Sequence, residues 1–160
     1  MTLKIEIILP DQTLSLFKNT HLLKTYPVST GKKGIGEVYG SEKTPRGLHG
    51  IHAKFGKNAP ANTVFVSRIP TGELYEEKLK LNFPKRDWIL TRILQLEGLE
   101  PGKNQGGNVD TLQRCIYIHG CPDSTPLQIP GSRGCIRMRN VDIIELFDLV
   151  PLGTHVFISA

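Results

Sequence analysis

The residues best able to do chemistry lie in the last third of the chain. His119 ends an apolar run, and sixteen positions later Cys135 stands within the sequence Ser132-Arg133-Gly134-Cys135-Ile136-Arg137. A thiol, an imidazole and guanidinium groups together supply a nucleophile, a base and an anion-binding group. A free thiol, with a pKa of about 8.5, is mostly protonated at neutral pH. The pattern predicts that His119 takes the proton of Cys135 and that Arg133 and Arg137 favour the thiolate.

A glycine directly before the cysteine predicts a sharp turn with accessible backbone amides. The amides of Arg133, Gly134 and Cys135 are therefore candidates for an oxyanion hole, an arrangement in which each donor is typically worth about 10²–10³ in rate. His119 also needs a partner that orients its ring, and no carboxylate stands beside it in the sequence. The backbone carbonyl of Gly120 is the nearest candidate for that contact.

The segment from His119 to Met138 resembles the signature of the YkuD-type L,D-transpeptidase family, in which a histidine is followed by Ser/Thr-x-Gly-Cys and usually an arginine. Three upstream segments also resemble the core segments of that family and stand in the same order; they are Val28–Lys32, Thr44–Gly47 and Arg92–Glu100. The resemblance thus covers nearly the whole chain. One departure is Arg133, because members of the family often carry a histidine there.

By this resemblance Cys135 is an acylated nucleophile, His119 its base and Gly120 the carbonyl that orients the histidine. Arg137 is implied to bind substrate or support the site, and Ser132 and Tyr117 are further candidates for substrate contact. The implied substrate is a peptidoglycan tetrapeptide stem, from which terminal D-alanine leaves as a thioester forms on the cysteine. Water as acceptor makes an L,D-carboxypeptidase and an amine makes an L,D-transpeptidase, and both remain open.

The implied fold is mainly β: a single YkuD-like domain over residues 1–160, a mixed β-sandwich with one or two short helices. Alternation and turn residues predict strands over residues 3–9, 13–17, 21–29, 48–54, 63–69, 115–119 and 155–158. Residues 88–96 fit both a helical face and strand alternation, and the resemblance favours a strand for the second half. The glycine-rich stretch before Thr44 predicts a loop bordering the substrate groove. Asn140 is expected to cap a helix whose buried face contains Ile143, Leu146, Phe147 and Val150.

Composition narrows the classes of function. The net charge is +5 over 160 residues, but the cations are scattered and not interleaved with aromatics, which argues against nucleic-acid binding. The first ten residues are too short and too charged for a signal-peptide core, and no apolar run of about 18 residues offers membrane insertion. We therefore expect a cytoplasmic protein, or a periplasmic one if this chain is part of a longer exported protein. Oligomeric state and the preferred diamino acid of the stem stay open.

Three cysteines, an odd number, fit a reducing compartment better than a disulfide framework. A zinc site would need Cys115, His119, Cys121 and Cys135, but the CxxC pairs of structural zinc sites are absent, so we expect neither metal nor other cofactor. Cys115 is expected to be an inert core residue, and the role of Cys121 stays open.

His49 and His52 are interpreted as structural or pocket-lining residues. A sortase-like transpeptidase is an alternative enzyme, although its Thr-Leu-x-Thr-Cys motif is absent. A non-catalytic peptidoglycan-binding module is the alternative from another class, because it would keep a groove without needing a reactive thiol.

Overall fold

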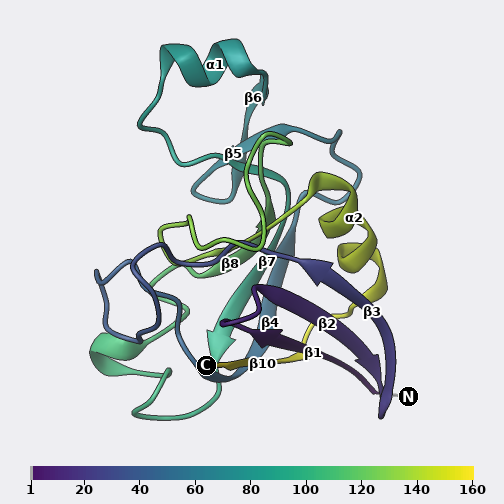
Figure 1. The fold of residues 1–160 in the computed structure, drawn as a ribbon, viewed down its shortest axis with the longest axis vertical. Helices are drawn as coiled ribbons and strands as arrows, with labels where there is room; N and C mark the ends of the chain where they lie inside the picture. Colours follow the sequence, from purple (N-terminus) through teal and green to yellow (C-terminus); the bar gives the residue numbers. More distant parts are fainter. Residues whose placement is uncertain (1) are drawn as a thin grey trace.

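The structure is a computed structural model that describes residues 2–160 (Figure 1). Ten strands form one sheet: β1 (Leu3–Ile8), β2 (Thr13–Lys18), β3 (His21–Pro27), β4 (Gly47–Phe55), β5 (Thr63–Val66), β6 (Ile69–Leu74), β7 (Ile89–Gly98), β8 (Tyr117–Gly120), β9 (Ile136–Met138) and β10 (His155–Ser159). The helices of the described residues are α1 (Glu77–Asn82), α2 (Asn140–Leu149) and a short 3-10 turn (Gly107–Val109). The prediction of a mainly β fold with one or two short helices is confirmed.

The sheet has the strand order β3-β2-β1-β10-β4-β7-β5-β6. Strands β1 to β3 are an antiparallel meander, as their short spacing predicts. Strand β10 runs parallel to β1 and antiparallel to β4, so the last strand joins the meander to the rest of the sheet. Strand β8 pairs with β7, and β9 runs parallel to β8. The two short strands that carry the candidate chemistry therefore branch from the long central strand.

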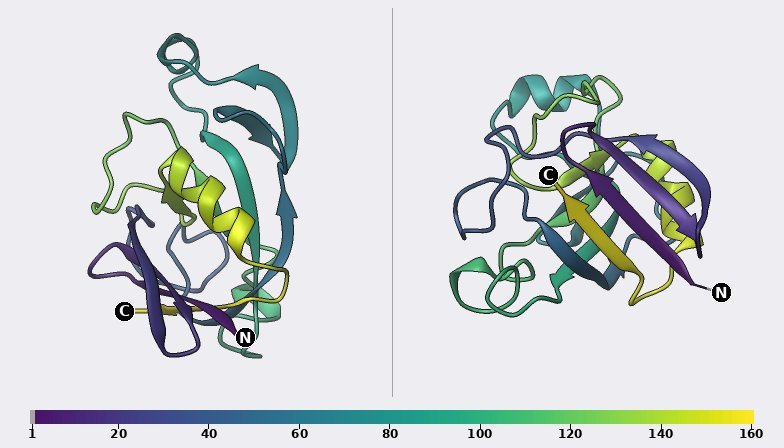
Figure 2. Two further views of the ribbon diagram at one scale, coloured as in Figure 1. Left: turned by 90° about the vertical axis from the view of Figure 1, so that its right-hand side faces the viewer. Right: turned by 60° about the horizontal axis from the view of Figure 1, so that its bottom comes forward.

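The sheet curls around helix α2 (Figure 2). Side chains of the β1–β3 meander meet those of the central strands and of α2 in one core, whereas β5 contributes to two smaller clusters. Helix α2 contributes the apolar face expected from its sequence, Ile143, Leu146 and Phe147, and Val150 follows directly after it. These side chains pack with residues of β1, β2, β7, β8 and β9. Burying this much apolar surface is the main stabilising contribution to such a fold, and it holds β8 and β9 rigidly against the helix.

The segment predicted as one strand over residues 63–69 is instead a hairpin of β5 and β6 (Figure 1). The chain reverses at Ser67 and Arg68, whose φ angles of 50° and 66° suit a two-residue hairpin turn. Serine is common in turns, but no glycine or asparagine marks this position, so local pattern did not predict the reversal. Helix α1 follows at the same end of the molecule and was not predicted, because none of its residues is buried and no apolar face repeats.

Strand β7 begins at Ile89 and includes all of the ambiguous segment except Trp88, so the second-half prediction is confirmed and most of the first half is strand as well. A bulge lies between Leu90 and Ile93, where buried Thr91 has a φ of 77°. A β-branched residue in that region is strained. The Thr91 hydroxyl donates to Asn140 Oδ1 at 2.6 Å, and the Asn140 amide donates to Asn62 at 3.0 Å and Asp123 at 3.2 Å.

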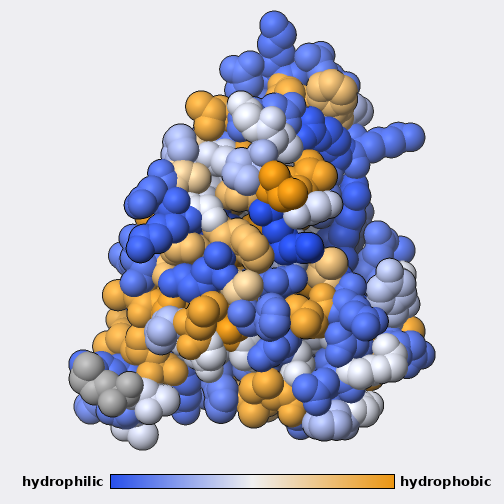
Figure 3. All heavy atoms as spheres, turned by 180° about the vertical axis from the view of Figure 1, so that it is seen from behind, coloured by the Kyte–Doolittle hydropathy of each residue, from blue (hydrophilic) through white to orange (hydrophobic). Residues whose placement is uncertain are grey.

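Asn140 is therefore not the cap of α2. The prediction was wrong because the residue is the first in the helix, and its buried side chain ties the bulge, a loop and the helix together. Seen from behind, the surface mixes polar and apolar residues (Figure 3). Within residues 2–160, neither α-helix has the length and apolar character required to cross a membrane.

Candidate active site

Strands β8 and β9 bring the two predicted catalytic residues together. Their parallel register sets Ile118 beside Ile136 and His119 beside Arg137. Cys135 directly precedes β9, and its sulfur accepts a hydrogen bond from the backbone N–H of Tyr117 at 3.3 Å. The nucleophile candidate therefore lies next to β8, two positions from the histidine along that strand. Parallel pairing of these two short strands closes the fifteen-residue connection between them, residues 121–135.

His119 is almost fully buried, with 1% of its surface exposed. Its Nδ1 lies 2.6 Å from the carbonyl oxygen of Gly120, the contact expected from the sequence. A carbonyl can only accept, so Nδ1 carries the proton and Nε2 keeps a lone pair. Burial lowers the pKa of His119, with the charge of Asp87 opposing that shift. The imidazole is therefore neutral and has the tautomer that a base requires.

Cys135 is half-buried, and its S–H donates to the carbonyl of Cys115 at 3.4 Å. Burial is the largest influence and raises the pKa of the Cys135 thiol to about 12, although the Tyr117 amide and Arg137 favour the thiolate. Arg137 favours the thiolate in the direction that the sequence predicts, but desolvation by burial acts the other way and has the larger effect on the pKa. In the protein without substrate the sulfur keeps its proton.

The ion pair of Asp87 and Arg137 influences both His119 and Cys135. Arg137 Nη2 lies 3.7 Å from Asp87 Oδ1, and both side chains are partly exposed. The charges of Asp87 and Arg137 act in opposite directions on the pKa of His119 and also on that of Cys135. The same two charges therefore influence the pKa of the imidazole and the pKa of the thiol. Asp87 was not among the predicted site residues, although a run of charged residues before Trp88 could have indicated it.

The turn before the nucleophile is held from two sides. Gly134 has a φ of 122°, as a sharp turn requires, and its carbonyl accepts a bond from the Thr44 hydroxyl at 2.9 Å. The Ser132 hydroxyl donates to the Cys135 carbonyl at 2.6 Å and accepts from the Gly134 amide at 3.0 Å. The geometry gives Ser132 a structural part, whereas the sequence predicted a substrate contact. The Gly134 amide is also engaged, so Arg133 and Cys135 are the remaining oxyanion-hole candidates.

The glycine-rich loop adjoins this turn. Gly31 forms a β-bridge with Ser132, and the Gly31 amide donates to the Thr44 hydroxyl at 2.8 Å. Arg114 fixes the other side of the loop by donating to the carbonyls of Gly36 and Lys43 at 3.2 and 2.6 Å. The sequence offered no signal for this role of Arg114.

Cys115 was expected in the core and that prediction was wrong. The residue is exposed and precedes β8, and its φ of 56° turns the chain out of the sheet. Its carbonyl contacts the nucleophile candidate instead. Tyr117, by contrast, is buried, and its hydroxyl accepts a bond from Arg68 of the β5–β6 turn at 2.9 Å. A substrate contact through that hydroxyl would require Arg68 to share it.

The other predicted residues lie away from the site. His49 is fully buried between the Gly47 carbonyl and the Thr111 hydroxyl, each 3.0 Å away, and burial lowers its pKa to about 4. Its role is structural. His52 is exposed and lies 2.9 Å from Glu97. Cys121 is buried and its thiol donates to the Met138 carbonyl at 3.2 Å.

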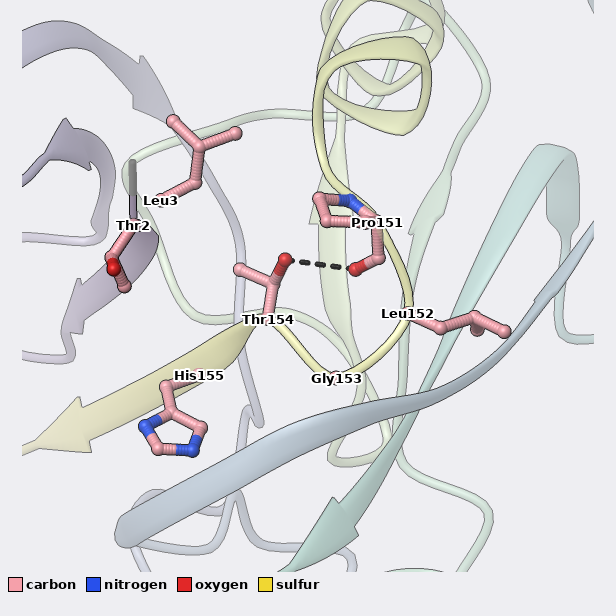
Figure 4. A pocket seen from close by; sticks show the side chains of 7 residues that line it. All are labelled: Thr2, Leu3, Pro151, Leu152, Gly153, Thr154 and His155. Atoms are coloured by element: carbon pink, nitrogen blue, oxygen red, sulfur yellow. Dashed lines mark hydrogen bonds between the residues drawn. The ribbon is translucent and has the colours of Figure 1, made fainter.

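A hollow of about 270 Å³ lies near the start of β1 and of β10 (Figure 4). It is lined by Leu3, Leu152 and Thr154 among others, and the Thr154 hydroxyl donates a hydrogen bond to the Pro151 carbonyl at 2.8 Å. It has no cysteine and no member of the His119–Cys135 pair. It is not a candidate for the chemistry.

This fold and this site define a class of protein, and comparison with known proteins identifies it. The profile of the YkuD family, the L,D-transpeptidase catalytic domain, matches residues 3–158. The chain therefore belongs to the L,D-transpeptidase catalytic domain family, a family of enzymes.

Two relatives are each named putative L,D-transpeptidase YkuD. The protein from Bacillus subtilis is 28% identical over 92% of this chain and 60% of its own length, and that from Bacillus licheniformis is 29% identical over 98% and 65%. The chain thus spans less than two thirds of these relatives. A solved structure of L,D-transpeptidase 3 from Mycobacterium tuberculosis, in complex with a faropenem-derived adduct, has the same fold. It aligns with a TM-score of 0.60 at 16% identity and covers 99% of this chain and 60% of the other.

Proposed function

We propose that this chain catalyses acyl transfer on peptidoglycan tetrapeptide stems through a thioester on Cys135. His119 Nε2 takes the thiol proton as the sulfur attacks the amide carbonyl carbon before the terminal D-alanine. The carbonyl π electrons move to oxygen, where the amides of Arg133 and Cys135 donate to it. When the C–N bond breaks, the imidazolium returns the proton to the departing amine. The products of this half-reaction are free D-alanine and the thioester.

The second half-reaction uses the same groups. His119 takes a proton from the acceptor as that acceptor attacks the thioester carbonyl, and the sulfur leaves and regains a proton. Water as acceptor gives a trimmed stem and an amine of another stem gives a cross-link. Substrate binding excludes water around the thiol, so proton transfer is coupled to attack rather than preceding it, which accommodates a thiol that is protonated at rest.

The observation that carries this proposal is the tautomer of His119. A buried, neutral imidazole whose Nδ1 is bound to the Gly120 carbonyl at 2.6 Å serves as a base, and β8 holds it beside the strand that delivers Cys135. A non-catalytic peptidoglycan-binding module would need none of this arrangement. Burying an imidazole N–H without an acceptor costs free energy, and the contact with the Gly120 carbonyl avoids that cost.

The test incubates the purified chain with a disaccharide tetrapeptide, with and without an added amine acceptor, and follows products by mass spectrometry. Loss of one alanine identifies carboxypeptidase activity and an amide-linked adduct identifies transpeptidase activity. Cys135→Ala should abolish both, and Cys121→Ala, which alters a buried thiol that donates to the Met138 carbonyl, serves as the matched control. No product with the unaltered chain would contradict the proposal.

A covalent probe tests the nucleophile without the natural substrate. The relative from Mycobacterium tuberculosis was solved with a faropenem-derived adduct, and faropenem presents a strained carbonyl to a thiol. We expect a mass increase on the peptide that contains Cys135 and none in Cys135→Ala. An adduct located on Cys115 alone would assign the reactivity to surface exposure and argue for the binding-module alternative.

A further inference from the structure

A second hollow, of about 250 Å³, is lined by Arg133 and Arg137, the two arginines that flank Cys135 in the sequence. It is polar in character and lies between the segment that leads into β7, the end of α1 and the turn before the nucleophile. Its charged lining residues are Lys80, Arg86, Asp87, Arg133 and Arg137. Four cations and one carboxylate thus converge from separate parts of the sequence, a concentration that the scattered charges of the sequence did not predict.

Not all of these charges are compensated. Arg86 makes two hydrogen bonds to the carboxylate of Glu73, at 2.8 and 3.1 Å, and Arg137 lies 3.7 Å from Asp87. Lys80 and Arg133 have no carboxylate oxygen within 4.0 Å among residues 2–160. Arg133 donates only to the backbone carbonyl of Lys85, at 2.7 Å. The hollow therefore holds an excess of two positive charges facing solvent.

Two residues that line the hollow are also close to the nucleophile in the sequence. Arg133 and Arg137 each stand two residues from Cys135. Arg137 follows Cys135 along β9, and alternate residues of a strand point to the same face. The charges of Arg137 and Asp87 also reach both the thiol and the imidazole. An anionic group that contacts Arg137 in the hollow would thus lie on the face of β9 to which the Cys135 side chain also points.

We propose that this hollow is a carboxylate-binding subsite for the peptide that Cys135 attacks, with Lys80 and Arg133 as its specificity-determining residues. The proposal rests on the proposed function and deepens it. The carboxylate of a terminal alanine is separated from the scissile nitrogen by the α-carbon alone, which suits a subsite whose two arginines are each two residues from the nucleophile. A guanidinium also matches a carboxylate better than an imidazole does, since it offers two parallel donors at any pH. That gives a physical reason for an arginine at position 133.

Other carboxylates of the stem have the same chemistry, so the test separates them. Hydrolysis or transfer is measured with three peptides: the tetrapeptide acid, its C-terminal amide, and the acid amidated on its isoglutamate. The proteins are the unaltered chain, Arg133→Gln, Lys80→Gln and Arg133→Lys. Lys78→Gln is the control, because Lys78 is exposed on the same helix but does not line the hollow.

With the tetrapeptide acid, Arg133→Gln and Lys80→Gln should each raise KM about tenfold with kcat little changed, since a charge-assisted hydrogen bond is lost. Arg133→Lys should recover part of this, and Lys78→Gln should match the unaltered chain. Whichever amidated peptide no longer distinguishes Arg133→Gln from the unaltered chain identifies the carboxylate. Equal KM values for all proteins with all peptides would overturn the subsite.

Binding without turnover separates failure of this subsite from failure of the proposed function. In Cys135→Ala, calorimetric titration of the tetrapeptide acid should show affinity that falls about tenfold when Arg133→Gln is added. An unaltered chain that turns over substrate while the variants bind equally refutes only the subsite. A chain that neither turns over nor forms a penem adduct refutes the reaction instead.

Discussion

Replacing Gly134 by alanine should damage the turn that presents the nucleophile. The residue has a φ of 122°, where side chains are rarely tolerated. A Cβ built there would lie 3.1 Å from the Lys43 carbonyl oxygen and 3.3 Å from Ile116 Cδ1. The neighbours cannot retreat easily, because one is backbone tied to Arg114 and the other is a core side chain.

The magnitude has two parts. A positive φ costs a non-glycine residue about 1–2 kcal/mol, and overpacking adds about 1 kcal/mol or more. Gly153→Ala separates them: Gly153 has a φ of 82° and nothing within 4 Å of a built Cβ. We therefore expect Gly153→Ala to lower the free energy of unfolding by about 1–2 kcal/mol and Gly134→Ala by about 2–3 kcal/mol.

Urea unfolding measures these free energies, and turnover of the tetrapeptide measures the displacement of the sulfur. A shift of about 1 Å at a reacting atom costs about 10² in rate, so Gly134→Ala should lose at least that much while Gly153→Ala retains its activity. Equal stability of the two variants, or full activity of Gly134→Ala, would refute the argument that φ and the Lys43 carbonyl jointly fix this turn.

Three other results follow from the site and its surroundings. Burial lowers the pKa of His49 to about 4 from an ordinary 6.5. Between these two pKa values the unfolded chain binds a proton at His49 that the folded chain does not bind. The free energy of unfolding should therefore fall by about 2 kcal/mol as the pH is lowered from 6.5 to 5. His49→Gln, measured by urea unfolding at each pH, should flatten that dependence, and an unchanged slope would contradict it. Iodoacetamide at pH 7 should label exposed Cys115 before Cys135, as read by peptide mapping, because burial keeps the thiol of Cys135 protonated; faster labelling of Cys135 would mean that the thiolate forms without substrate. Asn140→Ala should lower the unfolding free energy by about 2–3 kcal/mol in thermal or urea unfolding, because buried partners including Thr91 lose their bonds, and a change no larger than that of exposed Asn82→Ala would refute the network.

Local pattern was enough to predict most strands and the two residues of the candidate pair. Apolar alternation defines β1, β2 and β10, and the sequence around Cys135 contains the turn glycine that the structure uses. The Gly120 carbonyl was predictable because a buried histidine must bond to something and no carboxylate was near. These inferences succeed where the physical cause lies within a few residues.

The failures have non-local causes. The pKa of Cys135 depends on burial by β8 and the loop before it, which no spacing reports. Asparagine is a common helix-capping residue, but the Asn140 side chain instead forms hydrogen bonds with Thr91 and Asp123, which are distant in sequence. The reversal at Arg68 occurs without glycine or asparagine, so the turn relies on pairing of β5 with β6. Asp87 gains meaning only when Arg137 is placed opposite it.

The position of β10 has a consequence for how the protein is made. This strand lies between β1 and β4, so the amino-terminal meander gains its link to the site-bearing strands through residues 155–159. A ribosome still translating position 140 would hold two partial sheets with open edges, each able to pair wrongly. Productive assembly must therefore await synthesis of residues 155–159, and chaperone protection of those edges during translation would raise the yield of folded protein.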